Sequence, residues 1–167
     1  NQFWAFSITA GLQGEPSRFL ASFDPVASPA QMVEAVRSWS PTEARTRFDD
    51  ANAALADAVA AIGAADDPDP WALLAETPPG HLSLRALALH ALWDSWIHER
   101  DIAVPLGLDP VLEADEIAAA LGYVAGLGPA FAVLGGSTRQ GALDLRATDP
   151  DLRFVVHLDG GSVTVDR

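Results

Sequence analysis

Apolar residues recur at helical spacing along most of the chain and at strand spacing near its end. This pattern predicts helices over residues 3–12, from residue 28 onwards, over 40–63, over 83–101 and over 113–134. Glycines and a proline, such as Gly122 and Pro129, weaken the last of these helices. The sequence is therefore that of a mainly helical protein.

Two segments carry the same signal for the start of a helix. Ser28 and Ser40 are each followed by a proline, and three residues after each serine comes a glutamine or a glutamate. A serine at this position can accept a hydrogen bond from the backbone N–H three residues later, and proline fits the first helical turn because it has no N–H to leave unpaired. We therefore expect two capped helices, the second of them ending at Gly63.

The character of the sequence changes after Gly135 and Gly136. Residues 143–147, 154–158 and 162–166 have strand-like patterns, and turn-forming residues separate them. These features predict three short antiparallel strands. We expect a helical domain over residues 1–134 and part of an α+β domain over 135–167. Because the chain opens inside an apolar stretch and closes just after a strand, we also expect pieces to be missing at both ends.

The helix predicted over residues 83–101 carries the candidate chemistry. Residues 86–97 are apolar on nearly all sides, which is typical of a helix buried among other helices. His90, Asp94 and His98 lie four residues apart and so share one face, where ionisable groups are costly unless paired or bound to metal. His90 and His98 are separated by about 12 Å of helix rise, so the ligand pair is His90 with Asp94 or Asp94 with His98. A hydrogen-bonded acid–histidine pair without metal explains the spacing equally well.

Composition narrows the possible partners. The net charge of −13 repels phosphate groups, so we expect no nucleic-acid partner and no acidic membrane surface. The chain contains no cysteine, so it can form no disulfide and has no thiolate of its own. We see no bilayer-spanning run and no signal peptide, and we expect a soluble cytoplasmic protein. The acidic cluster at residues 66–69 is a weaker candidate for an interaction site, since such clusters are usually solvated loops.

The run from Leu92 to Ile102, followed by Pro105-Leu106-Gly107, resembles the family of mycothiol-dependent maleylpyruvate isomerases. That family belongs to the DinB/YfiT-like superfamily of metal-dependent helical bundles. The resemblance implies a DinB-like four-helix bundle followed by the start of a small α+β C-terminal domain. It also implies a divalent metal, with zinc as the expected ion, held by three side chains. Two of these match Asp94, where many members carry glutamate, and His98; the third, a histidine, belongs a few residues before the position of Trp4.

The resemblance further implies an isomerase, monomeric or homodimeric, that acts on a small-molecule substrate with mycothiol or a similar small thiol. In that family a thiolate adds across a cis double bond conjugated to carbonyls, and rotation and expulsion give the trans isomer. His90 is the candidate acid–base residue, although a core hydrogen bond also explains it, and Glu99 and Asp101 are candidates to orient the ligands. Two alternatives stay open: a thiol S-transferase of the same superfamily, and a non-catalytic binding or regulatory domain that has lost the metal.

Overall fold

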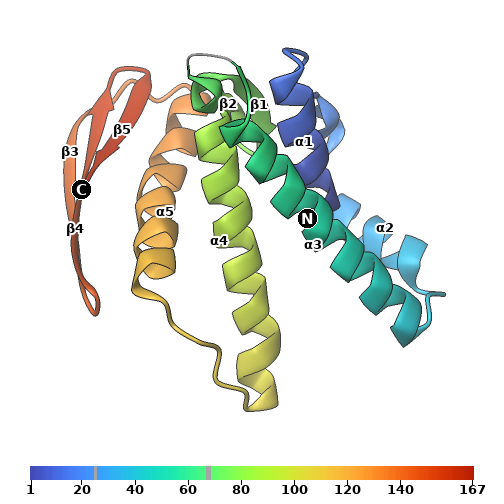
Figure 1. The fold of residues 1–167 in the computed structure, drawn as a ribbon. Coiled ribbons are helices and arrows are strands. Elements are labelled where there is room, and N and C mark those ends of the chain that lie inside the picture. Colours follow the sequence, from blue (N-terminus) through green and yellow to red (C-terminus); the bar gives the residue numbers. More distant parts are fainter. Residues whose placement is uncertain (25, 67–68) are drawn as a thin grey trace. The chain divides into compact units, whose positions relative to one another are not determined.

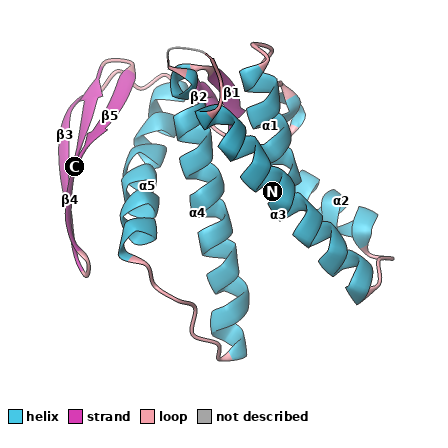
Figure 2. Ribbon diagram, in the orientation of Figure 1, coloured by secondary structure: helices cyan, strands magenta, loops and turns pink. Residues whose placement is uncertain are grey.

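The computed structural model describes residues 1–24, 26–66 and 69–167, and these form two compact units, residues 1–88 and 89–167 (Figure 1). The chain is mainly helical, with a small antiparallel sheet of three strands at its C-terminal end (Figure 2). Each unit is described by itself. Asp67 and Pro68, half of the acidic cluster at 66–69, lie outside the described residues.

The first unit is built mainly from helices. It contains α1 (Gln2–Leu12), the 3-10 turn η1 (Phe19–Ser22), α2 (Ala27–Val36), α3 (Pro41–Gly63), the 3-10 turn η2 (Pro70–Ala72), strands β1 (Leu74–Thr77) and β2 (Gly80–Ser83), and the start of α4 (Leu84–Ala103). The helix α3 begins as predicted, because Ser40 Oγ accepts a hydrogen bond from the backbone N–H of Glu43 at 3.2 Å.

The start of α2 differs from the prediction. Ser28 does not cap this helix, which begins one residue earlier, at Ala27. Instead, Asp24 Oδ1 accepts hydrogen bonds from the backbone N–H groups of Val26 and Ala27 at 2.8 and 2.7 Å. Ser28 Oγ accepts one from the backbone N–H of Asp24 at 3.0 Å. A carboxylate is a stronger acceptor than a hydroxyl, which explains why the aspartate takes the first free N–H groups.

The hairpin formed by β1 and β2 was not predicted. Its strands are antiparallel, with Leu74 opposite Ser83 and Thr77 opposite Gly80. Each strand has four residues, too few to show an alternating pattern. Gly80 has a positive φ of +127°, a conformation that glycine adopts without steric cost.

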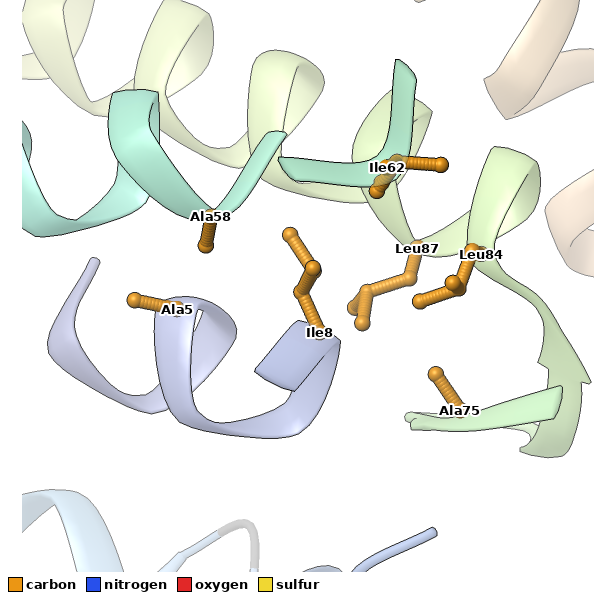
Figure 3. Close-up of a cluster of buried hydrophobic side chains, with 7 residues drawn as sticks. All are labelled: Ala5, Ile8, Ala58, Ile62, Ala75, Leu84 and Leu87. Atoms are coloured by element: carbon orange, nitrogen blue, oxygen red, sulfur yellow. The ribbon is translucent and has the colours of Figure 1, made fainter. Parts of the chain in front are cut away.

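The core of the first unit lies where α1, α3, β1 and the start of α4 meet (Figure 3). Alanines on α1 and α3 allow the two helices to approach closely, and larger aliphatic side chains fill the remaining space. Gly11 belongs to the same packing, since a Cβ there would lie 2.8 Å from the backbone oxygen of Leu74. The buried members of this core are Ala5, Ile8, Ala58, Ile62, Ala75, Leu84 and Leu87.

The second unit pairs a long helix with a sheet. It contains the rest of α4, the 3-10 turn η3 (Val104–Leu106), α5 (Ala114–Leu134), and strands β3 (Gln140–Thr148), β4 (Asp151–Asp159) and β5 (Ser162–Asp166). The strands form the predicted antiparallel meander, in the order β3-β4-β5. Gly122 leaves room on α5 for the ring of Phe154, because a Cβ there would lie 3.1 Å from the ring. The predicted domain boundary after residue 134 stays a prediction.

The helix α5 corrects one expectation from the sequence. By length and composition alone it is long and apolar enough to cross a bilayer. Its glycines and its proline, which we expected to weaken the helix, do not break it. The length and composition of α5 are weak evidence for a membrane segment, because one side of the helix packs against β4 and β5 through Ala118 and Ala125.

Candidate functional site

The helix α4 carries His90, Asp94 and His98 in one unbroken run, as predicted. Its first turn is fixed by Ser83, whose Oγ accepts a hydrogen bond from the backbone N–H of Ala86 at 3.2 Å. The helix is not buried all round, which corrects the expectation drawn from its apolar composition. His90 is 4% exposed, whereas the side chains of Asp94 and His98 are 27% and 64% exposed. The stripe therefore runs from the interior to solvent.

The imidazole of His98 lies between two carboxylates. Its Nε2 is 3.5 Å from Asp94 Oδ1, and its Nδ1 is 3.3 Å from Asp101 Oδ2. Both separations are longer than the usual N–H···O hydrogen bond of about 2.9–3.0 Å. The structure thus brings together Asp94 and His98, one of the two pairs that the helical spacing allows and the pair that the resemblance implies. Asp101 lies on the other side of the ring.

The spacing of Asp94 and His98 can be tested against a metal site. A carboxylate oxygen and an imidazole nitrogen each bind zinc at about 2.0–2.2 Å, so two such donors on a tetrahedral ion lie about 3.3 Å apart. The observed 3.5 Å is close to this value, so the two residues fit as two ligands of one ion. Among the described residues no group of three or more acidic, histidine or cysteine side chains gathers around one point. The pair therefore offers two metal donors, one fewer than the three that the resemblance implies.

His90 sits in an aromatic cluster that the sequence did not reveal. Its Nδ1 is 2.8 Å from the hydroxyl of Tyr123 on α5, and the two rings meet edge to face with centroids 5.4 Å apart. Trp93 completes the cluster, with its ring centroid 5.6 Å from that of His90 and 6.0 Å from that of Tyr123. A tyrosine within an apolar helix is the signal that we missed, because a buried tyrosine hydroxyl usually has a hydrogen-bond partner.

Burial governs the protonation of this cluster. It lowers the pKa of His90, against the opposing effect of the Asp94 carboxylate. It also raises the pKa of the Tyr123 hydroxyl far above its ordinary value, and here the charge of Asp94 acts in the same direction. Both side chains are therefore neutral near pH 7.

Arg100 fixes the last turns of α4 to the segment that follows. Its guanidinium stacks on the ring of Trp96 at 3.7 Å, and it donates hydrogen bonds to the backbone oxygens of Trp96 and Val111 at 2.9 and 3.1 Å. Glu99 Oε2 is 3.1 Å from Arg100 Nη1, so this carboxylate forms an ion pair with the arginine. Of the two candidates to orient the ligands, Asp101 is therefore the one that contacts His98.

The two remaining histidines belong to strands. His81, on β2, has its Nε2 2.7 Å from the backbone oxygen of Ser17. His157, on β4, has its Nε2 3.2 Å from Asp166 Oδ2. His157 and His98 are thus both solvent-exposed histidines beside an aspartate, which makes His157 a natural control for His98.

Comparison with known proteins found no matching family model, curated protein or solved structure. The resemblance to the maleylpyruvate isomerases stays a hypothesis that depends on residues 92–107.

Proposed function

We propose that this protein is a metal-dependent isomerase that uses a small thiol, of the mycothiol-dependent maleylpyruvate isomerase type. The observation that carries the proposal is the convergence of Asp94 Oδ1 and His98 Nε2 at 3.5 Å, a spacing suited to two ligands of one divalent ion. The resemblance of residues 92–107 to that family supplies the reaction type. A four-helix bundle, a cytoplasmic location and a third ligand outside the described residues are parts of the same proposal.

Asp101 supports the assignment of His98 as a ligand. Metal-binding histidines almost always donate their second ring N–H to a carboxylate, a backbone carbonyl or water, and this fixes the tautomer that offers the other nitrogen to the metal. Asp101 Oδ2 stands 3.3 Å from Nδ1, which leaves Nε2 facing Asp94. When bound, a divalent ion would lower the pKa of an incoming thiol so that the thiolate forms near neutral pH.

The thiol must come from outside, because the chain has no cysteine. Its sulfur adds to one carbon of a cis double bond, and the electron pair moves onto the conjugated carbonyl oxygen. The former double bond, now a single bond, rotates. The electron pair then returns from the oxygen to re-form the double bond in the trans arrangement, the carbon–sulfur bond breaks, and the thiolate leaves unchanged, so no oxidant or reductant is needed. His90 is neutral and is the candidate to donate a hydrogen bond to the carbonyl oxygen as its charge grows.

The metal site is tested by metal content per chain. Purified full chain is loaded with zinc, dialysed and analysed beside His98→Ala and the control His157→Ala, which removes an exposed β4 histidine that lies 3.2 Å from one aspartate. We expect about one zinc per chain in the wild type and in His157→Ala, and a large loss in His98→Ala. Asp101→Asn should weaken zinc binding by about 10–100-fold. Equal zinc content in His98→Ala and His157→Ala would refute the site.

Activity is tested separately with the zinc-loaded chain, mycothiol and maleylpyruvate. Formation of the trans isomer that depends on both zinc and thiol is the expected result. Consumption of the thiol with a stable thioether product would instead identify an S-transferase.

One observation favours a second function, that of a non-catalytic binding or regulatory domain. Asp94 and His98 stand without a third acidic or histidine ligand among the described residues. Absence of zinc binding in a folded wild-type chain under zinc-replete conditions would favour this function and contradict the isomerase proposal.

A further inference from the structure

The surface formed by α2 and the first turns of α3 is exposed along its whole length. Residues 26–48, all of which the structure describes, contain no buried side chain, and only Ser28 and Trp39 are half-buried. We call these residues the α2–α3 face. A helix as short as α2, with ten residues, has little stability in water by itself and normally depends on the packing of one of its sides. A partner on this face would therefore stabilise α2.

The apolar residues of α2 have the spacing of a helix that packs against another surface. Val36 follows Met32 by four residues and Val33 by three, so the three side chains share one side of the helix. They are 57%, 58% and 37% exposed for Met32, Val33 and Val36 in turn. Apolar side chains gathered in this way at a surface mark a site of interaction more often than scattered ones do.

The apolar side of α3 extends beyond the core of the first unit. Phe48, Leu55 and Ile62 recur every seven residues, which places them on one side of the helix. Ile62 is fully buried and Leu55 packs against the core, whereas Phe48 is 63% exposed. The first turns of α3 thus offer apolar surface beside that of α2 in the sequence, and the core of the first unit does not use it.

Charge distinguishes the α2–α3 face from the rest of the chain. The face has three arginines and two glutamates, a net charge of +1, whereas all other residues together carry −14. Over most of its surface the chain therefore repels a second copy of itself. The α2–α3 face has both signs side by side, since Arg37 Nε is 2.6 Å from Glu34 Oε2 and Arg47 Nη2 is 3.1 Å from Glu43 Oε1. It is thus suited to meet another copy of the same surface.

We propose that the α2–α3 face is a dimer interface, in which the face of one chain contacts the same face of a second copy across a two-fold axis. The apolar sides of the helices form the centre of this contact, and the arginine–glutamate pairs form its polar rim. The face has 23 residues. This number lies within the roughly 20–30 residues per partner that form a stable interface burying about 800 Å² on each side.

The dimer is tested by sedimentation equilibrium of the full chain from low to high micromolar concentration. We expect the mass to rise from 17.6 kDa to that of two copies. Val33→Glu should raise the dissociation constant more than about tenfold, because it places a carboxylate in an apolar contact. Leu106→Glu is the matched control, since Leu106 is 70% exposed and lies outside the face, and it should leave the constant unchanged. A monomer at every concentration, a mass beyond two copies, or equal constants in the two variants would overturn the proposal.

Hydrogen exchange then locates the contact. As the dimer forms, the amides of residues 31–36 should gain protection, whereas those of residues 152–158 on β4 should not change. Protection of α2 that is independent of concentration would show that its own chain covers it, and would contradict the proposal. If Val33→Glu does not fold, as judged by circular dichroism, the wild type decides through the same concentration dependence. Because these measurements use neither metal nor thiol, failure of the isomerase proposal leaves them unchanged.

Discussion

Glu76, on β1, is a buried carboxylate that holds a distant segment in place. It is 4% exposed and accepts three hydrogen bonds, each 2.7 Å long, from Ser17 Oγ and from the backbone N–H groups of Phe19 and Leu20. Ser7 Oγ also donates to its backbone oxygen at 2.9 Å. Removing this acceptor should therefore release the segment before and within η1.

The size of the effect follows from these contacts. A hydrogen bond to a charged group contributes about 1.5–3 kcal/mol, and burial of the carboxylate offsets part of the total. Glu76→Gln keeps the shape but replaces one accepting oxygen by an NH₂ group. In one orientation this group faces the N–H of Leu20, and in the other it faces the N–H of Phe19. We expect the free energy of unfolding to fall by about 2 kcal/mol.

The assay is urea unfolding followed by tryptophan fluorescence, with hydrogen exchange as a local reading. Glu34→Gln is the matched control, because Glu34 pairs with Arg37 on a surface where both side chains are 68% exposed. Such a pair should contribute no more than about 0.5 kcal/mol. In Glu76→Gln the amides of Phe19 and Leu20 should also lose protection from exchange. Equal stability in the two variants, with unchanged exchange at Phe19 and Leu20, would refute this account of Glu76.

Two further predictions concern protonation and packing. Burial lowers the pKa of His90, so as pH falls the unfolded chain binds a proton at this residue before the folded chain does. The free energy of unfolding should therefore fall by up to about 1.4 kcal/mol per pH unit below about pH 6.5. His90→Gln should remove that part of the slope in urea titrations between pH 8 and 5. Gly11→Ala should cost about 1–3 kcal/mol in thermal melts, because its methyl group would lie 2.8 Å from Leu74 O. Gly63→Ala, with open space around it, should be neutral or stabilising.

The parts of the fold that could be predicted are those specified by neighbouring residues. The start of α3 at Ser40 and its end at Gly63 are each signalled by residues at that end of the helix. The strands after Gly136 are long enough for their pattern to be recognised. Local signals of this kind survive folding because each is satisfied by backbone groups a few positions away. The stripe of His90, Asp94 and His98 was predictable for the same reason, since helical spacing alone places residues four apart on one face.

The parts that could not be predicted depend on contacts between distant residues. Ser17 and Glu76 are 59 positions apart, and His90 and Tyr123 are 33 apart, so no local pattern links either pair. The burial of α4 was misjudged for a related reason. The apolar residues of α4 indicate that its surface can be buried. Which of its turns are buried depends on which other elements of the fold pack against them.

Exposure increases along α4 from His90 to His98. For this reason an experiment can distinguish whether Asp94 and His98 are a structural pair or a pair of metal ligands. A histidine side chain that is 64% exposed, beside an aspartate at 3.5 Å, contributes little to stability as a simple ion pair, about 0–1 kcal/mol. Asp94→Ala combined with His98→Ala should therefore leave the protein folded whichever explanation holds. A structural pair predicts almost no consequence, whereas a ligand pair predicts loss of zinc from a protein that is otherwise intact. His90 allows no such separation, because it is buried and any change there also alters the packing around Tyr123.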